Sequence, residues 1–253
     1  MHMSTVFDLQ GKTILVTGAG RGIGRALTLA ASSSGATVGA LELDPSLLQL
    51  LMSESGSERI VPLEADVANR DAVMAAANKL ARITGQIDAV INNAAVIQYQ
   101  PIEEVSEATL DRILAVGIKG AVWGVQALLA HMDPARGAVL INMSSPVAER
   151  GYPRSSIYAM TKAAMSSFTR SMAVELGPRG IRTNALAPGS VPTPGAVAMT
   201  SAQEYQRRAA TIPLRRLGQE EDCTHSILFL LSDRASFING AILHVDGGIA
   251  AAG

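Results

Sequence analysis

The sequence predicts an α/β protein in which helices cover both faces of a doubly wound parallel sheet. Short runs of apolar and β-branched residues alternate with longer segments of helical periodicity from residue 12 to residue 245. Such alternation is typical of a parallel sheet, because parallel strands need a crossover connection that is usually a helix. Most of the short runs are continuously apolar, as expected for strands covered on both faces.

Seven segments are predicted as strands: Thr13–Thr17, Thr37–Leu43, Ile60–Leu63, Ile87–Ile91, Ala138–Met143, Arg182–Ala187 and Ala241–Val245. Helices are predicted over residues 23–33, 70–83, 107–131, 157–176 and 221–231. Asn69 and Ser106 precede two of these helices and can cap the free amides of the first turn. After the sixth strand, three prolines lie within Pro188–Pro194, and a short helix is expected over Ser201–Ala210. Ligands of such sheets bind beyond the carboxyl ends of the strands, so this insertion is predicted to overhang the site.

The chain is expected to form one domain over residues 1–253. Its length permits two small domains or one large α/β unit, and no linker, repeat or low-complexity tract divides it. Charged residues make up 17% of the chain, below the usual share of about 25%, which predicts extensive burial, including burial between subunits. The formal net charge of −1 leaves no surplus to bind nucleic acid or an acidic membrane surface.

No targeting or membrane segment is expected. Met1–Thr5 lacks the basic start and the apolar stretch of a signal peptide. The apolar run Ala115–Leu129 is interrupted by Lys119 and Gln126 and is shorter than the ~20 residues needed to cross a bilayer. The single cysteine, Cys223, cannot pair within the chain, which fits a reducing compartment. These observations predict a cytoplasmic protein.

A glycine-rich turn follows the first predicted strand and leads into a helix. Its spacing is T-G-x-x-x-G-x-G rather than G-x-G-x-x-G. Glycine lets the backbone approach a pyrophosphate, and the free amides at the helix start favour its negative charge. The glycines alone could also form only a tight connection between strand and helix. Their position after the first strand favours a dinucleotide site. The turn residues expected to bind the cofactor are Gly18, Arg21, Gly22, Ile23 and Gly24.

Two charged residues give opposite indications of the cofactor. Glu42 ends the second strand, where an acidic side chain can accept both ribose hydroxyls of NAD and repel a 2′-phosphate. Arg21 could instead pair with the 2′-phosphate of NADP. Either residue could also be an ordinary solvated charge. NAD is the favoured cofactor, and NADP is the alternative.

Tyr158 and Lys162 lie one helical turn apart on the same face of the predicted helix 157–176. A free tyrosine has a pKa of about 10, and a neighbouring cation favours the phenolate, which brings the group closer to acid/base work at neutral pH. Ser144 and Ser145 follow the fifth strand, at the edge where sites form. A serine there can also merely cap the backbone.

Further motifs accompany these: Asp66-Val67, Asn92-Asn93-Ala94-Ala95, Asn184 before Pro188-Gly189, and Val245-Asp246-Gly247-Gly248. With them, essentially the whole chain resembles the short-chain dehydrogenase/reductase family in its single-domain form. The resemblance implies a Rossmann-like, seven-stranded sheet and an NAD(P) cofactor. In addition to the glycine turn and Glu42, it implies cofactor contacts from Asp66, Val67, Asn92, Ala94, Tyr158, Lys162, Pro188, Gly189, Val191 and Thr193.

The resemblance also implies the roles of these positions. Asp66 would lie near the adenine, and the Pro188–Thr193 turn would close over the nicotinamide. Ser145 would hydrogen-bond the substrate oxygen, and Tyr158 would exchange its proton. Lys162 would lower the pKa of the tyrosine and hold the nicotinamide ribose. Two fixed hydroxyl donors can stabilise alkoxide character on the substrate, which agrees with these roles.

The sequence departs from the family pattern in the predicted helix 107–131. Gly117 stands where the family usually has an asparagine whose main chain helps to hold a proton-relaying water. A glycine inside a helix costs roughly 1 kcal/mol relative to alanine, so it marks space for water, a kink, a close contact or a damaged relay. Smaller departures are Ala95, where glycine is frequent, and Pro146 directly after Ser145.

Other chemistries have little support in the sequence. Ser190 follows a glycine but lacks the G-x-S-x-G elbow of a serine hydrolase. Arg207-Arg208 and Arg215-Arg216 could contact an anionic substrate or partner, but they are interpreted as solvated helix faces. Trp123 is assigned to the core or to subunit contacts. No metal site is expected, because the histidines lack metal-ligand spacing: His2, His131, His225 and His244.

The substrate wall is expected from Val96–Tyr99, Pro146–Ser155 and Gly189–Ala210. Apolar side chains in these segments are Tyr99, Val147, Tyr152 and Met199, whereas Glu149, Arg150 and Arg154 could face either ligand or water. The sequence therefore predicts oxidoreduction of a hydrophobic or aromatic secondary alcohol and its ketone. One alternative is reduction of a 3-ketoacyl group on a carrier protein with NADPH. Another is a cofactor-binding sensor or scaffold with little turnover, which Gly117 leaves open.

The resemblance further implies a homotetramer. Its contacts would come from the helices predicted over 107–131 and 157–176 and from Ala241–Gly253. The low charged fraction is consistent with buried subunit contacts.

Overall fold

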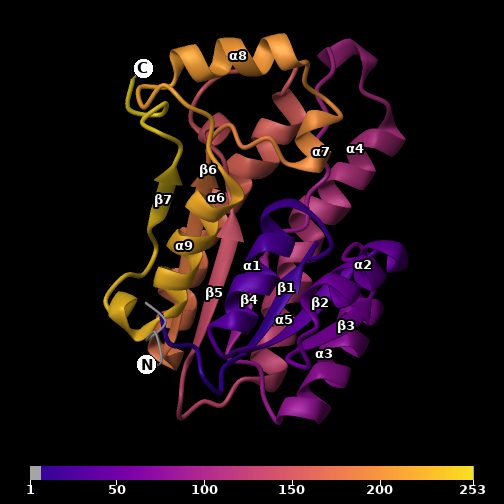
Figure 1. The fold of residues 1–253 in the computed structure, drawn as a ribbon, viewed down its shortest axis with the longest axis vertical. Coiled ribbons are helices and arrows are strands. Elements are labelled where there is room, and N and C mark those ends of the chain that lie inside the picture. Colours follow the sequence, from indigo (N-terminus) through magenta and orange to yellow (C-terminus); the bar gives the residue numbers. More distant parts are fainter. Residues whose placement is uncertain (1–6, 253) are drawn as a thin grey trace.

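The computed structural model describes residues 7–252 and contains one seven-stranded parallel sheet with helices on both faces (Figure 1). The strand order is β3-β2-β1-β4-β5-β6-β7. The predicted fold class is confirmed, and each predicted strand is present with ends that shift by at most two residues. The strands are β1 (Thr13–Thr17), β2 (Thr37–Glu42), β3 (Ile60–Glu64), β4 (Ala89–Asn92), β5 (Ala138–Met143), β6 (Ile181–Pro188) and β7 (Ile242–Val245). Met1–Val6, with the predicted N-terminal features and His2, and Gly253 lie outside the described residues.

The long helices agree with the predicted segments, with two exceptions. The helices are α1 (Gly22–Ser33), α2 (Pro45–Ser55), α3 (Arg70–Thr84), α4 (Glu107–Leu114), α5 (Gly120–His131), α6 (Ser156–Leu176) and α9 (Glu220–Leu231). Helix α2 was not predicted, although Asp44 caps it by accepting a hydrogen bond from the Ser46 amide and Gly56 ends it in a left-handed conformation. The segment predicted as one helix over 107–131 is divided by a π-helical turn, η2 (Ala115–Lys119), with Gly117 at its centre.

The expected capping residues are confirmed in the structure. Asn69 accepts hydrogen bonds from the amides of Asp71 and Ala72 at the start of α3. Ser106 accepts one from the Thr109 amide at the start of α4. Each bond satisfies an amide that the first helical turn leaves without a partner.

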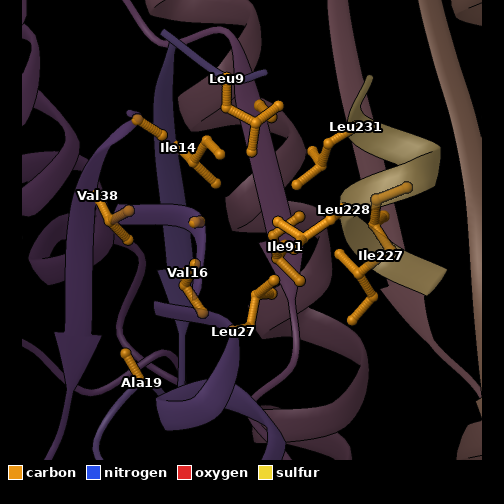
Figure 2. Packing of buried hydrophobic residues seen from close by; sticks show 14 of the residues in the cluster. Leu9, Ile14, Val16, Ala19, Leu27, Val38, Ile91, Ile227, Leu228 and Leu231 are labelled. Atoms are coloured by element: carbon orange, nitrogen blue, oxygen red, sulfur yellow. The ribbon is translucent and has the colours of Figure 1, made fainter. Parts of the chain in front are cut away.

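Consecutive residues of β1 face two different cores, which explains why the strand is apolar throughout. Ile14 and Val16 belong to a cluster formed with α1 and α9, whereas Leu15 belongs to a second cluster on the other face with α3 and α5. Figure 2 shows Leu27 of α1 and Ile227 of α9 converging on the first cluster. Full burial of one such side chain contributes about 1.5–3 kcal/mol, so both faces stabilise the sheet.

The helical segment Glu107–His131 has the length and composition to cross a membrane, and 44% of its most apolar window is buried within this fold. Its α5 part packs against β4 and α3. Trp123 of α5 is partly buried against the second cluster. The rest of the apolar surface of this segment remains uncovered in one chain.

The strand order reverses between β1 and β4, which places a crevice beyond the carboxyl ends of these neighbouring strands. Two short helices of the insertion after β6, α7 (Pro194–Val197) and α8 (Ala202–Thr211), lie over this edge, with α8 across the top of Figure 1. The short helix expected over Ser201–Ala210 is thus confirmed. Ser201 caps it by accepting a hydrogen bond from the Glu204 amide. The ends of β1, β2, β4, β5 and β6 therefore meet beneath a cover supplied by α7 and α8.

Candidate active site

A cleft of ≈ 430 Å³ lies at the carboxyl edge of the sheet. Its walls come from the β1–α1 turn, the ends of β2, β4, β5 and β6, helix α6 and the insertion with α7 and α8. All three expected catalytic side chains line it: Ser145, Tyr158 and Lys162. The expected cofactor residues that line it are Gly18, Arg21, Gly22, Ile23, Glu42, Asp66, Val67, Ala94, Tyr158, Lys162, Pro188, Gly189, Val191 and Thr193.

The glycine turn requires glycine for both conformation and space. Gly18 and Gly22 have φ angles of +65° and +58°, in the left-handed region that favours glycine. A Cβ on Gly24 would lie 2.1 Å from the carbonyl oxygen of Gly18, so Gly24 permits the close packing of α1 against β1. Gly20, which the motif leaves free, is also constrained, because its Cβ would lie 2.8 Å from Cγ of Glu42.

Glu42 is held between the glycine turn and the end of β2. Its Oε2 accepts a hydrogen bond from the Gly20 amide at 3.0 Å, and its Oε1 accepts bonds from the amides of Leu43 and Asp44 at 2.8 and 3.3 Å. Backbone amides therefore fix a negative charge at one end of the cleft. Hydrogen bonds from Ser46 lower the pKa of the nearby Asp44 carboxyl. The charge of Arg21, in the glycine turn, lowers it further by a smaller amount.

Asp66 is paired with a residue that the sequence analysis did not identify. Nη1 of Arg112, in α4, lies 2.7 Å from Oδ2 of Asp66, while Oδ1 accepts a hydrogen bond from the Ala68 amide. Burial raises the pKa of the Asp66 carboxyl, but the bonds from Arg112 and Ala68 outweigh it, so the pKa is below its usual value. Arg112 also lines the cleft. The pair joins two elements 46 residues apart, which no local motif reveals.

The two serines after β5 have different surroundings. The Ser144 hydroxyl donates to the carbonyl oxygen of Lys162 at 3.1 Å and lies 2.7 Å from the Ser166 hydroxyl, so it fastens the end of β5 to α6. The Ser145 hydroxyl instead accepts a hydrogen bond from the Val147 amide at 3.5 Å, lines the cleft and lowers the pKa of the Tyr158 phenol. This arrangement separates a packing serine from the serine in the cleft.

Lys162 is 6% exposed, and its Nζ donates a hydrogen bond to the carbonyl oxygen of Met143 at 2.8 Å. Burial disfavours the charged form and lowers the pKa of Lys162 to about 8. The Nζ atom lies 5.5 Å from the centroid of the Tyr158 ring. The expected helical juxtaposition of ammonium and phenol is present.

The expected lowering of the Tyr158 pKa is not present in this conformation. Burial raises the pKa of Tyr158, Tyr99 raises it further, and the nearby Ser145 side chain opposes them. The ammonium of Lys162 is directed to the Met143 carbonyl, where it does not offset this burial. The Tyr158 phenol is therefore held in its protonated form at neutral pH.

The turn after β6 is supported by the C-terminal motif. The Gly189 amide donates to the carbonyl oxygen of Val245 at 3.0 Å, and a Cβ on Gly189 would lie 2.6 Å from Cα of Asp246. The Asp246 carboxylate accepts hydrogen bonds from the amides of Gly248 and Ala250. Asn184 ties the two segments together by donating to the Ile238 carbonyl and accepting from the Ala241 amide.

Two residues expected at the cofactor lie outside the cleft. Gly24 is buried where α1 meets β1. The Asn92 side chain is buried in the interior, where its Nδ2 donates to Oδ1 of Asn142 at 2.8 Å and to the Ala121 carbonyl. The neighbouring Asn93 lines the cleft instead, and its Nδ2 donates to the carbonyl oxygens of Thr17 and Gly18. The motif thus joins β1 to β4, but its first asparagine does not face the cleft.

The expected substrate wall needs two corrections. Pro146–Ser155 does not contribute to the cleft; Glu149 pairs with His244 at 3.3 Å, and Arg150 donates to the Ile249 carbonyl. Met199 is exposed and also lies outside. The other two expected segments do line the substrate end, with Val96, Ile97, Tyr99, Gly195, Ala196, Thr200, Tyr205 and Arg208.

Of the two basic pairs, Arg208 alone departs from the interpretation as solvated faces, and Arg215 and Arg216 are exposed. Arg207 is exposed, as expected, but Arg208 lines the cleft. Arg216 forms an ion pair with Asp222 at 2.6 Å. The i, i+3 relation between Tyr205 and Arg208 on one face of a short helix that overhangs the site was the available signal for their position.

Gly117 lies beside a second, much smaller cavity of ≈ 10 Å³, which Lys162 and Asn92 also line. This volume is close to that of a single water-sized probe. A Cβ on Gly117 would lie 3.5 Å from Cβ of Thr161, an ordinary contact. Space for a side chain is therefore available, and the π-helical turn rather than steric exclusion distinguishes this position.

The chain is similar to known proteins over nearly its whole length. A family model described as enoyl-(acyl carrier protein) reductase matches residues 18–250. L-xylulose reductase of Bos taurus is 39% identical over 246 residues, which cover 96% of this chain and 98% of that protein. A 3-ketoacyl-(acyl-carrier-protein) reductase from Brucella melitensis, solved with NADH, has a TM-score of 0.90 at 29% identity and covers 96% of this chain and 100% of its own.

A short-chain dehydrogenase/reductase from Serratia marcescens gives a TM-score of 0.88 at 30% identity and covers 96% of this chain and 99% of its own. These matches extend over nearly the whole chain rather than over one motif. The agreement in fold, length and sequence places this chain in the short-chain dehydrogenase/reductase family, and it is an oxidoreductase that uses a nicotinamide cofactor.

Proposed function

We propose that this protein transfers a hydride between NAD(H) and a secondary alcohol or its ketone, with Ser145, Tyr158 and Lys162 as catalytic residues. The observation that carries the proposal is that these three side chains line one cleft, with Nζ of the buried Lys162 5.5 Å from the centroid of the Tyr158 ring and Ser145 near enough to lower the pKa of the Tyr158 phenol. Two hydroxyl donors at one point suit an oxygen that gains negative charge.

The residues of the cleft fit a dinucleotide. A Cβ on Gly22 would lie 3.1 Å from Cβ of Thr193, so the glycine leaves a surface of bare backbone at the N-terminus of α1, where free amides suit a pyrophosphate. Glu42 would hold the adenosine ribose, and Asp66 would face the adenine. Lys162 and the Pro188–Thr193 turn would hold the nicotinamide half.

Glu42 supports NAD over NADP. Three backbone amides fix its carboxylate at the cleft, which leaves lone pairs for ribose hydroxyls and places a negative charge where a 2′-phosphate would lie. Arg21 lines the same end and keeps NADP as the alternative. Replacement of Glu42 by serine should therefore shift the ratio of kcat/KM values for NADH and NADPH toward NADPH.

The catalytic side chains divide the proton chemistry between them. The bound nicotinamide supplies the hydride donor or acceptor. Tyr158, whose pKa burial raises, holds a proton that it can donate to a ketone oxygen. Ser145 contributes the second hydrogen bond to that oxygen. Lys162, with its pKa lowered to about 8, can release or accept a proton near neutral pH.

The substrate end of the cleft supports an aromatic or hydrophobic compound. The Tyr99 ring lies edge-on to the Tyr158 ring, with centroids 5.9 Å apart, and Tyr205 also lines the cleft. Offset and edge-to-face aromatic contacts contribute about 0.5–1.5 kcal/mol beyond burial. A 3-ketoacyl carrier substrate with NADPH is the second enzymatic candidate, which the similarity to the Brucella melitensis reductase favours. A sensor with little turnover is the candidate from another class.

A substrate screen tests the proposal. Oxidation of NADH and NADPH is followed by absorbance with aromatic and aliphatic ketones and with a 3-ketoacyl thioester, and the reverse reaction with the alcohols. Tyr158→Phe should abolish turnover while the variant still binds NADH, which shows that the loss is not a loss of folding. Tight NAD binding without turnover across the panel would favour the sensor.

We also propose that the protein is a cytoplasmic homotetramer. The uncovered apolar surface of the Glu107–His131 segment, exposed Val174 on α6 and exposed Phe237 before β7 support subunit contacts. Sedimentation of a monomer at micromolar concentration would contradict this assembly.

A further inference from the structure

The charges lining the cleft are arranged by sign. The acidic residues that line it are Glu42 and Asp66, and both lie at the end assigned to the adenosine. The substrate end is lined by the cations Lys162 and Arg208 and by no acidic residue. Lys162 is occupied by the Met143 carbonyl and by its expected catalytic role. Arg208 is thus a cleft cation that hydride transfer does not require.

Arg208 is held in place by Glu204 and by Tyr152. Its Nε lies 3.0 Å from Oε1 of Glu204, one turn earlier on α8. Its Nη2 donates to the Tyr152 hydroxyl at 2.7 Å, and its guanidinium lies 5.1 Å from the centroid of the Tyr152 ring. The Arg208 side chain is 21% exposed. These contacts orient the guanidinium and reduce the entropy that ligand binding would otherwise cost.

The single carboxylate of Glu204 does not neutralise the two guanidinium groups of Arg207 and Arg208 on α8. Glu204 is shared between Arg208 and Arg207, whose Nη2 lies 2.5 Å from Oε2 of the same carboxylate. The cluster of two guanidinium groups and one carboxylate therefore carries a net positive charge beside the cleft. Because Glu204 itself does not line the cleft, a ligand meets the cation rather than its partner.

A second polar group next to Arg208 lacks a partner. The Tyr205 hydroxyl is buried and has no hydrogen bond among the described residues, and Tyr205 lines the cleft. The Arg208 guanidinium lies 5.8 Å from the centroid of this ring. A buried hydroxyl without a partner is costly, and a ligand oxygen would satisfy it.

We infer that the substrate is an aromatic ketone or alcohol with a carboxylate remote from its reacting carbon, and that Arg208 binds this carboxylate with help from the Tyr205 hydroxyl. The inference rests on the proposed function and adds the charge of its substrate. Guanidinium is suited to a planar carboxylate, because its N–H groups match both oxygens. Arg208 is a specificity-determining residue in this account, and Ser145 and Tyr158 remain at the reacting end.

The competing explanation is that Arg208 only fastens α8 to the Tyr152 loop. A fastening role predicts that loss of Arg208 impairs charged and neutral substrates equally, because the cover would be misplaced for both. A carboxylate-binding role predicts selective loss for the charged substrate. The ratio of two kcat/KM values therefore separates the explanations, even where a variant damages the cover.

The test compares 4-acetylbenzoate with 4-acetylbenzamide, which have similar shape and differ in charge, as substrates with NADH. The acid should have the higher kcat/KM, and Arg208→Gln should reduce the acid-to-amide ratio roughly 10- to 100-fold, as expected for loss of a charged hydrogen bond. Arg208→Lys should restore part of the ratio. Glu204→Gln should raise it, since the competing carboxylate is removed, and the exposed control Arg207→Gln should change it less than Arg208→Gln.

Equal kcat/KM values for acid and amide, or a ratio that Arg208→Gln leaves unchanged, would overturn the inference. Failure of the proposed function is distinguishable, because it appears as absence of turnover with both ketones. In that case calorimetric titration of both compounds into the NADH-saturated protein tests whether Arg208 binds the carboxylate. Tighter binding of the acid that Arg208→Gln abolishes supports the inference, and equal affinities overturn it.

Discussion

The Lys162 ammonium lies 5.5 Å from the centroid of the Tyr158 ring, and its hydrogen bond goes to the Met143 carbonyl. The two groups are therefore adjacent, yet burial acts on them in opposite senses. It raises the pKa of the phenol and lowers that of the ammonium, because the charged form is disfavoured in each case. Both shifts favour neutral side chains, a phenol that donates a proton and an amine that can accept one.

The pH dependence of the two directions of reaction should differ. Ketone reduction needs protonated Tyr158, whose pKa is raised, so kcat/KM for reduction should stay level through neutral pH and fall only in alkaline solution. Alcohol oxidation needs the base form and should become faster as pH rises. Steady-state rates measured in both directions across the same buffers check this. If kcat/KM for reduction already decreases with rising pH at values below about pH 7, the raised pKa of Tyr158 is contradicted.

Stability should also depend on Lys162. Its folded pKa of about 8 is below the ordinary lysine value of 10.5, so between these values the unfolded chain binds more protons, and stability rises with pH. Below this window the buried ammonium destabilises the fold by up to roughly 3.5 kcal/mol, at about 1.4 kcal/mol for each pKa unit. Urea unfolding from pH 7 to about pH 9 should show a smaller upward slope for Lys162→Met than for the original protein. Identical slopes would mean that Lys162 has an ordinary pKa.

Substitutions at Gly117 separate helix propensity from proton exchange. A Cβ there makes only an ordinary contact with Thr161, so Gly117→Ala should raise the free energy of unfolding by about 0.5–1 kcal/mol. Gly117→Asn adds a polar side chain beside the ≈ 10 Å³ cavity near Lys162 and should change the pH profile of turnover relative to Gly117→Ala. If the two profiles coincide, position 117 has no part in proton exchange.

Arg112 should support cofactor binding through Asp66. Removal of its guanidinium frees the Asp66 side chain and removes a positive charge from the cleft, so Arg112→Ala should raise the dissociation constant of NADH several-fold. The dissociation constant of AMP should rise in parallel, whereas that of nicotinamide mononucleotide should not. Arg70→Ala removes an arginine whose Nε bonds Gln126 outside the cleft and serves as the control. Equal weakening of both half-ligands would indicate general damage rather than loss at the adenine end.

Glycine substitutions should have contrasting effects on stability. A Cβ on Gly24 would overlap the Gly18 carbonyl at 2.1 Å, and relief of this overlap requires α1 to move away from β1. We therefore expect Gly24→Ala to cost more than about 2 kcal/mol, as overpacking does, and to weaken NADH binding. Gly151 has open space and no positive φ, so Gly151→Ala should be nearly neutral. Thermal unfolding of both variants checks the contrast.

The fold was predictable because its signals are local. Continuous apolar runs such as Val139–Ile141 arise from strands covered on both faces, and the turn Gly18–Gly24 carries its own spacing. Helix α2 was missed although Asp44-Pro45 marks its start, because its few buried side chains give weak periodicity. The π-helical turn has no comparable signature.

The parts of the site that sequence reasoning missed depend on distant pairing. The pair Asp66–Arg112 forms only because the fold brings α4 beside the loop that follows β3, and Arg208 reaches the cleft only because the insertion with α8 covers this edge of the sheet. Asn92 was misplaced for a related reason, since Asn142 on the neighbouring strand draws its amide inward. Such contacts follow from tertiary packing and leave no fixed spacing in the sequence.

The distribution of aromatic residues gives this protein two separate spectroscopic reporters. All four of its tyrosines surround Arg208 or the reacting end, namely Tyr99, Tyr152, Tyr158 and Tyr205. Its single tryptophan, Trp123, lies on α5, where the Arg70 guanidinium is 5.9 Å from its ring centroid. Near-ultraviolet circular dichroism of the tyrosines should thus follow occupancy of the substrate end, while indole fluorescence follows the integrity of the helical layer.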